Sequence, residues 1–260
     1  MRLPTPILAA GVVLAASAST AAIVTETVEY RHGDVVLEGY LAWDDAIAGA
    51  RPGVLVVHQW LGLGENEQMR ARLLAEMGNV AFAVDVYGKG VRPRDAAEAR
   101  QEAAKYYGDR RLLRGRLAAA LARLVESPLA DSRRIAAIGY CFGGAGALEL
   151  ARSGADLAGV VSFHGSLDTP DPTEARTIKG KVLVCHGAAD PHVGPDQVRA
   201  FVEEMEAAEV DYQLVMYGGA VHGFTQKEAG DDPSRGAAYD AAADRRSWQH
   251  LKVFFDEIFD

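Results

Sequence analysis

Apolar residues recur along the chain with two different periods. Short apolar runs predict buried strands, and longer stretches with apolar residues three or four positions apart predict helices. Beyond residue 50, the predicted strands lie at 54–57, 80–84, 134–138, 160–163, 182–185 and 212–216. The predicted helices lie at 67–77, 96–107, 110–125, 145–151, 195–207 and 237–258.

Two earlier stretches, 24–30 and 35–43, alternate apolar and polar residues on either side of a turn at 31–34. This pattern predicts an antiparallel hairpin at one edge of a sheet. Strands that alternate with helices indicate a mostly parallel sheet covered by helices on both faces. The pattern therefore predicts an α/β fold.

A glycine-flanked cysteine marks the centre of the chain. The sequence Gly-Tyr-Cys-Phe-Gly-Gly at 139–144 follows a predicted strand and opens a predicted helix. This spacing is typical of a nucleophile elbow, in which glycines allow the backbone to pass close to a strained turn. The turn would expose the Cys141 sulfur and leave the Phe142 amide free at a helix start. The alternative is a buried thiol at a tight turn.

An acid and a histidine follow in the order that such a site requires. Asp190 comes after the predicted strand 182–185, and His222 comes after the strand 212–216. In α/β-hydrolases the chain order is nucleophile, acid, histidine, and the three loops share one edge of the sheet. Taken separately, Asp190 could instead cap a helix or form a turn. His222 could be an ordinary loop histidine.

The sequence resembles the dienelactone hydrolase family from about residue 54 to the C-terminus. The resemblance is carried by the segments 57–62, 85–88, 139–144, 186–190 and 222–224. It implies an α/β-hydrolase fold with an eight-stranded, mostly parallel sheet, helices on both faces and no large cap domain. It also implies a catalytic triad of Cys141, Asp190 and His222, with the backbone amides of Trp60 and Phe142 as oxyanion donors.

The chain departs from the family pattern at three positions that bear on the substrate. Gln59 stands where the enzymes that open dienelactone carry a glutamate, and Lys89 and Gln226 stand where they carry two arginines that bind the substrate carboxylate. A glutamine offers no countercharge, and neither residue offers the bidentate fork of arginine. The residues assigned to the substrate pocket are Gln59, Tyr87, Lys89, His164, Phe224 and Gln226.

Five histidines fall at or just beyond predicted strand ends, where open α/β sheets bind ligands. They are His58, His164, His186, His192 and His222. A zinc site is the alternative interpretation of such a cluster, but its spacing matches no common zinc motif. We therefore expect no metal, and the expected thiol chemistry needs no other cofactor.

The N-terminal segment has a charged start, a short apolar stretch and small residues near Ala18 and Ala22. It predicts a secretory signal peptide at 1–22, cleaved after one of these alanines, ahead of a single hydrolase domain at 23–260. A retained membrane anchor is the alternative. We expect an exported protein, periplasmic or secreted, without stable membrane association.

The formal net charge is −9. An acidic chain without clustered Lys and Arg excludes nucleic acid as a partner. The second cysteine, Cys185, ends a strand separated from that of Cys141 by the strand 160–163. The two Cα atoms should then be roughly 9–10 Å apart, beyond disulfide reach, so we expect both thiols to be reduced.

The sequence thus predicts a hydrolase of small carboxylic esters or lactones that acts through a thioester, as a monomer or a homodimer. Two alternatives remain open. One is a non-catalytic binding module on a hydrolase fold. The other is a cysteine-based acyltransferase or a redox-responsive thiol enzyme.

Overall fold

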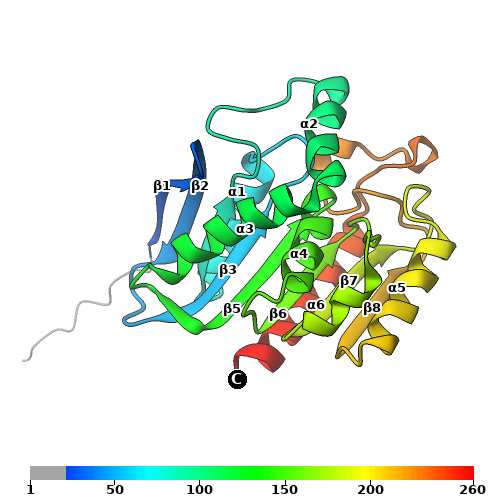
Figure 1. The fold of residues 1–260 in the computed structure, drawn as a ribbon. Helices are drawn as coiled ribbons and strands as arrows, with labels where there is room; N and C mark the ends of the chain where they lie inside the picture. Colours follow the sequence, from blue (N-terminus) through cyan, green and yellow to red (C-terminus); the bar gives the residue numbers. More distant parts are fainter. Residues whose placement is uncertain (1–21) are drawn as a thin grey trace, which may run out of the picture.

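A computed structural model describes residues 22–260 of the chain. The predicted signal peptide lies outside these residues except for Ala22. Among residues 22–260, none of the helices combines the length and the hydropathy that a membrane crossing requires. Eight strands form one sheet in the order β1-β2-β4-β3-β5-β6-β7-β8 (Figure 1).

The strands are β1 (Ile23–His32), β2 (Val35–Asp44), β3 (Arg51–Val57), β4 (Val80–Val84), β5 (Ala130–Tyr140), β6 (Gly159–Phe163), β7 (Lys181–Gly187) and β8 (Tyr212–Tyr217). The α-helices are α1 (Glu65–Glu76), α2 (Ala96–Gly108), α3 (Arg110–Val125), α4 (Phe142–Arg152), α5 (Pro195–Ala207) and α6 (Ala241–Phe259). Three short 3₁₀ helices are η1 (Pro172–Thr177), η2 (Lys227–Ala229) and η3 (Pro233–Arg235).

The sheet is parallel from β4 through β3 to β8 and antiparallel at its other edge. There β1 pairs with β2, and β2 pairs with β4, in antiparallel register. The predicted hairpin and the predicted mostly parallel sheet are both confirmed. Because the carboxyl ends of parallel strands meet at one edge, the loops after β3, β5, β7 and β8 converge there.

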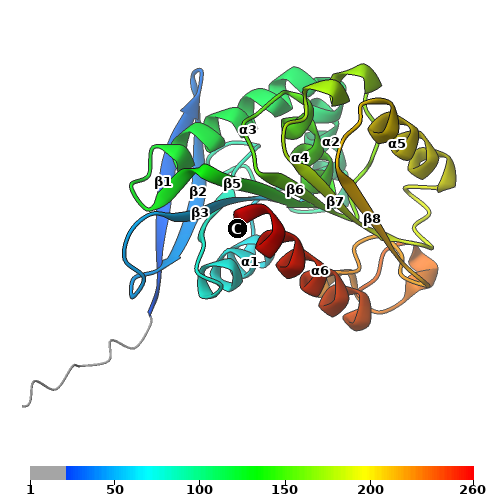
Figure 2. The ribbon, with the colours of Figure 1, turned by 90° about the horizontal axis from the view of Figure 1, so that it is seen from below.

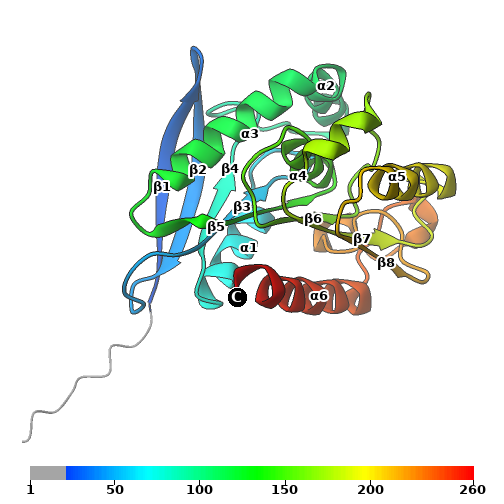
Figure 3. The same ribbon diagram turned by 60° about the horizontal axis from the view of Figure 1, so that its bottom comes forward.

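Helices cover both faces of the sheet (Figures 2 and 3). Helices α1 and α6 lie on one face, and α3, α4 and α5 lie on the other. Each face has its own apolar core: Leu74, Leu251 and Phe254 belong to the first, and Leu113, Leu148 and Phe201 to the second. Strands β4 and β6 are buried at every position, which explains why their sequences show no alternation.

Several element boundaries differ from those predicted; α6, for example, begins at Ala241 rather than at residue 237, and β3 at Arg51 rather than at residue 54. Helix α4 begins at Phe142 rather than at residue 145, because its first turn contains two glycines that a propensity argument excludes from a helix. Strand β5 begins at Ala130 rather than at residue 134, since Ala130 and Asp131 pair with β3 before a shift of register. The pattern of apolar residues does not predict strand pairing that lies before such a shift of register.

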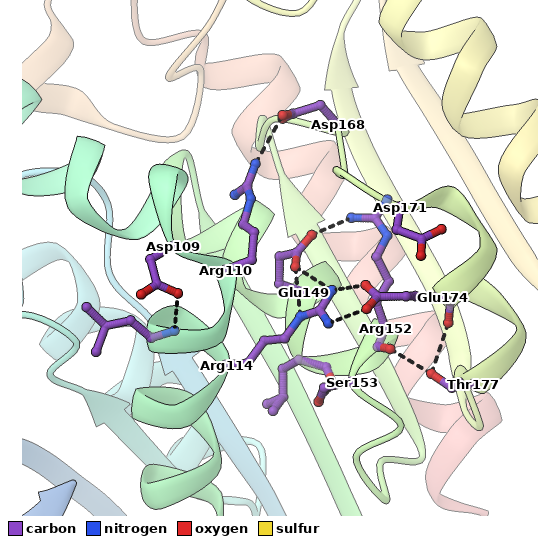
Figure 4. Close-up of polar contacts among 12 residues, drawn as sticks. Asp109, Arg110, Arg114, Glu149, Arg152, Ser153, Asp168, Asp171, Glu174 and Thr177 are labelled. Atoms are coloured by element: carbon purple, nitrogen blue, oxygen red, sulfur yellow. Dashed lines mark hydrogen bonds and ion pairs between the residues drawn. The ribbon is translucent and has the colours of Figure 1, made fainter. Parts of the chain in front are cut away.

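A buried network of charges joins α4 to its neighbours (Figure 4). The Arg152 guanidinium is 1% exposed and donates to both carboxylate oxygens of Glu204 on α5, at 2.7 and 2.8 Å. It also donates to Glu149 at 3.3 Å, and Glu149 accepts from Arg114 on α3. Arg114 reaches Glu174 on η1 as well. Three helices and η1 are thus connected around the end of α4 that lies away from Cys141.

We predict that removing one partner of this network is costly. Glu204→Ala leaves the Arg152 charge buried with one carboxylate fewer, and should lower the free energy of unfolding by about 3–5 kcal/mol. Urea unfolding followed by circular dichroism measures the change. Asp196→Ala, which removes an exposed pair with Arg199 on the same helix, is the matched control and should have little effect. Equal effects of the two substitutions would contradict the prediction.

Candidate active site

Cys141 occupies a strained turn between β5 and α4. Its φ and ψ are 54° and −113°, a backbone conformation that side-chain-bearing residues rarely adopt. A Cβ at Gly139 would lie 1.9 Å from the Gly143 carbonyl oxygen, and one at Gly143 would lie 2.2 Å from the Val57 carbonyl oxygen. Only glycine fits at these crossings, which explains the glycine spacing in the sequence. The turn leaves Cys141 partly exposed.

The structure brings Cys141, His222 and Asp190 together in one hydrogen-bonded row. His222 Nε2 lies 3.0 Å from Cys141 Sγ, and His222 Nδ1 lies 2.8 Å from Asp190 Oδ2. The other Asp190 oxygen accepts the amides of His192 and Val193, at 2.8 and 3.2 Å. The loops after β5, β7 and β8 supply the three side chains, as their order along the chain predicts.

The charges in this row support one another. Burial opposes the charged form of the His222 ring, but Cys141 and Asp190 outweigh burial and raise the pKa of His222 to about 10. Burial likewise opposes ionisation of Asp190, yet the hydrogen bond from His222 holds the pKa of that carboxyl below its usual value. A protonated His222 ring is thus stabilised by its position between the Cys141 sulfur and the Asp190 carboxylate.

Two backbone amides beside the sulfur have no hydrogen-bond acceptor within the described part of the chain. They are those of Trp60, in the loop after β3, and Phe142, the first residue of α4. Both residues line the same cavity as Cys141. Unpaired amides at the start of a helix are suited to binding an oxyanion. The two amides that the family resemblance assigns as donors are therefore unpaired and belong to residues that line the cavity with Cys141.

A cavity of about 850 Å³ opens beside Cys141. Apolar side chains and a few polar groups line it, as is common for small-molecule sites. Its wall comes from the loop after β3, the start of α1, one face of α2 and the loop that follows His222. The lining residues include Gln59, Trp60, Leu61, Glu65, Glu67, Arg100, Ala103, Ala104, Tyr107, Phe142, His192, Val193, His222, Gln226 and Glu228.

Two of the six predicted pocket residues, Gln59 and Gln226, line this cavity. Gln59 Oε1 accepts the Leu61 amide at 2.9 Å, so its side chain is engaged with its own loop. The Gln226 side-chain nitrogen is buried and has no hydrogen-bond partner within residues 22–260. It is therefore an unpaired donor on a residue of the cavity wall.

Lys89 does not line the cavity, which corrects its assignment to the substrate pocket. Its ammonium group is half exposed and pairs with Glu29 and with Glu38, the latter at 3.2 Å. Both carboxylates belong to the β1–β2 hairpin, which therefore draws the lysine away from Cys141.

Tyr87, His164 and Phe224 are buried behind the cavity rather than lining it, which corrects three further assignments. The Tyr87 hydroxyl donates to the Trp60 carbonyl at 2.9 Å. The His164 Nδ1 accepts the Cys141 amide at 3.2 Å, and its ring packs against those of His222 and Phe224. These residues support the loops of the site from below.

Within the described residues, no group of three or more His, Cys, Asp or Glu side chains is arranged to hold a metal ion, and the five histidines form no such group. Burial lowers the pKa of His58 and His164, and of His186 to a lesser degree. Cys185 is buried and unlinked to Cys141, since β6 lies between their strands. Burial raises the pKa of the Cys185 thiol to about 12, which makes it unreactive near neutral pH.

Helix α2 contributes to the site, which the sequence did not predict. Arg100, Ala103, Ala104 and Tyr107 recur at three- or four-residue spacing along one face of this helix and line the cavity together. Ala103 and Ala104 have small side chains, which leave space in the cavity. Their helical spacing was visible in the sequence, but it is equally typical of a helix packed on the sheet.

Comparisons with known proteins agree with this fold. The family model described as "Dienelactone hydrolase family" matches residues 37–259. A solved dienelactone hydrolase-like promiscuous phosphotriesterase from metagenomic libraries is 42% identical, with a TM-score of 0.88 over 92% of this chain and 100% of that one. A probable 2-oxo-3-(5-oxofuran-2-ylidene)propanoate lactonase of Bradyrhizobium is 27% identical over 77% of this chain and 86% of its own. A putative carboxymethylenebutenolidase of Yersinia pestis is 26% identical over 85% and 84%.

The raised pKa of His222 predicts an unusual pH dependence for Cys141. If the imidazolium persists up to about pH 10, the rate of alkylation by iodoacetamide should change little between about pH 7 and about pH 9. A free thiol, with a pKa of about 8.5, instead reacts several-fold faster across this range. The His222→Ala variant should regain that rise, and Cys141→Ala should remove the labelling. A steep rise of the alkylation rate with pH in the wild-type protein would contradict a protonated His222 beside the Cys141 sulfur.

Proposed function

Because this chain belongs to the dienelactone hydrolase family, we propose that it hydrolyses small uncharged carboxylic esters or lactones. Cys141 is the nucleophile, His222 the base and acid, and Asp190 the group that orients His222. The observation that carries the proposal is the continuous row from Asp190 through His222 to the Cys141 sulfur, next to a cavity with two unpaired amides.

In the first half of the reaction the thiolate attacks the carbonyl carbon. The carbonyl oxygen becomes an oxyanion held by the amides of Trp60 and Phe142. When it collapses, the bond to the leaving oxygen breaks and that oxygen takes the proton from His222. An acyl group now sits on Cys141 as a thioester, and an alcohol is released; a lactone would keep the hydroxyl on the same molecule.

In the second half, neutral His222 accepts a proton from water as the water oxygen attacks the thioester carbon. The same two amides hold the second oxyanion. The carbon–sulfur bond breaks, the acid leaves and the Cys141 thiolate pairs again with protonated His222. Esters suit this sequence better than amides, because an amine is a poorer leaving group than the thiolate that competes with it.

The charges that line the cavity favour an uncharged substrate. Glu65 and Glu228 contribute carboxylates, and Arg100 on α2 is the one arginine or lysine among the described lining residues. Arg100 is exposed at the cavity rim. The Gln226 amide adds a neutral donor without a partner, which suits a carbonyl or ether oxygen rather than a carboxylate. We infer that the family's carboxylate recognition has been replaced here by recognition of neutral groups.

Phosphate triesters are a second candidate substrate class. One relative, at 42% identity, is described as a promiscuous phosphotriesterase. The cavity suits such molecules, since triesters are uncharged and the two amides could hold a phosphoryl oxygen. The thiolate would displace an aryl oxide, and water would then cleave the phosphorus–sulfur bond.

We predict that the triad residues act as a unit. Cys141→Ala or His222→Ala should lower kcat/KM for a nitrophenyl ester by ~10³-fold or more, and Asp190→Asn should lower it less. Stopped-flow or plate assays of nitrophenyl release, with a neutral phosphate triester in parallel, measure this. Retention of most ester activity by the Cys141 variant would refute a thioester mechanism. Absence of ester turnover in the wild-type protein would instead favour the binding-module alternative.

The substrate charge preference has its own test at residue 226. Gln226→Arg should raise kcat/KM for a nitrophenyl ester carrying a terminal carboxylate by about tenfold or more, since a charge-assisted hydrogen bond contributes about 1.5–3 kcal/mol. Gln226→Met is the control, since methionine is similar in size but has no donor. It should lower kcat/KM for the neutral ester and should not raise kcat/KM for the carboxylate-bearing ester. If Gln226→Arg does not change the preference between neutral and carboxylate-bearing esters, residue 226 does not contact the substrate.

A further inference from the structure

The peptide group between Gln59 and Trp60 is held at one end only. Its carbonyl oxygen accepts two hydrogen bonds, from His58 Nδ1 at 2.6 Å and from the Gly62 amide at 3.1 Å. Its N–H, which is the Trp60 amide, has no acceptor among the described residues. In a trans peptide the carbonyl and the N–H point in opposite directions. Whatever holds the Gln59 carbonyl therefore also aims the Trp60 N–H.

His58 is built to hold that carbonyl. The residue is 0% exposed and directly follows β3. Its Nε2 accepts the Val86 amide at 3.2 Å, so the ring proton must sit on Nδ1, where it is donated to the Gln59 carbonyl. Burial lowers the pKa of His58 to about 4 and keeps the ring neutral. One tautomer is thus selected by contacts on both sides.

The ring is also fixed in orientation. It packs edge-on against Tyr87, with centroids 4.6 Å apart, and stacks on Phe142 at 5.8 Å. Phe142 supplies the other unpaired amide of the site, so one aromatic cluster supports both amides. The neighbouring Trp60–Leu61 peptide is held separately, by the Tyr87 hydroxyl on its carbonyl and by Gln59 Oε1 on its N–H.

His58 does not line the cavity, and both of its nitrogens are occupied within the protein. It therefore touches neither the Cys141 sulfur nor a molecule bound beside it, and it acts on the reaction only through the peptide that it holds. If its Nδ1 donor were lost, the Gly62 amide alone would hold the Gln59 carbonyl. A flip of that peptide would then turn a carbonyl oxygen toward the oxyanion in place of an N–H.

We propose that His58 is a positioning residue that locks the Gln59–Trp60 peptide with its N–H turned toward the cavity, so that the oxyanion site is formed before substrate binds. This inference rests on the proposed thioester chemistry, because only an oxyanion requires the Trp60 donor. Loss of one oxyanion donor typically costs about 10²–10³-fold in kcat.

Two substitutions separate the two nitrogens of the ring. In asparagine the amide nitrogen is bonded to Cγ, as Nδ1 is in histidine, so His58→Asn can keep the donor to the Gln59 carbonyl. In glutamine the amide is one atom farther from the backbone, near the place of Nε2, so His58→Gln can keep the contact with Val86 but loses the lock. We expect His58→Gln to lower kcat for a nitrophenyl ester ~10²-fold with KM changed less than about threefold. His58→Asn should stay within about tenfold of wild type.

Alkylation of Cys141 by iodoacetamide is the second readout, because displacement of iodide forms no oxyanion. Both His58 variants should be alkylated at the wild-type rate. Equal loss of kcat in the two variants, or loss of alkylation along with turnover, would mean that His58 supports the fold and would overturn the proposal. If the proposed function itself is wrong, the result is different: the Cys141→Ala variant would hydrolyse the ester as fast as the wild-type protein.

A measurement on the wild-type protein avoids any effect of the substitutions on folding. In protein labelled with ¹⁵N-histidine, the nitrogen chemical shifts of His58 should report a neutral ring protonated on Nδ1, unchanged between about pH 5.5 and about pH 8. A ring protonated on Nε2, or one that gains a proton in this range, could not hold the peptide as proposed and would overturn it.

Discussion

The close crossing of β5, α4 and the β3 carbonyls is the constraint on which the rest of the site depends. Gly139 and Gly143 have no space for a Cβ, because backbone oxygens would lie 1.9 and 2.2 Å from it. This crossing holds Cys141 at a positive φ and presents its sulfur above the sheet. It also places the first turn of α4, with the free Phe142 amide, directly beside the loop after β3. One tight packing contact therefore brings the Cys141 turn and the start of α4 next to the loop that carries the Trp60 amide.

The charge states of the histidines are a second determinant of the site, after the backbone crossing. His222 lies between a sulfur and a carboxylate, and its raised pKa follows from the charges on both sides. The histidines beneath it differ, because burial keeps His58 and His164 neutral. Neutral rings can accept as well as donate a hydrogen bond, so they orient backbone groups without adding charge near the imidazolium. The same residue type thus occurs here both as the protonated ring between Cys141 and Asp190 and as neutral rings that support the loops.

Much of this arrangement could be predicted from the sequence. Cys141, Asp190 and His222 each follow a parallel strand, and their proximity was predictable because parallel strands end at one edge of the sheet. The pocket was harder to predict, since it depends on which way loops turn. Lys89 follows β4 as expected, but two glutamates of the β1–β2 hairpin attract it. The bond between His58 and Val86 joins loops of neighbouring strands, and no local pattern encodes such a contact.

The central claim is that the acyl group passes through the Cys141 sulfur. Rapid acid quenching during turnover of a slowly hydrolysed nitrophenyl ester, followed by peptide mass spectrometry, tests it most directly, because thioesters survive at low pH. We expect the peptide that contains Cys141 to carry one acyl group, and hydroxylamine to remove it. Turnover without an acylated Cys141 peptide, or with the acyl group on another residue, would contradict the thioester mechanism.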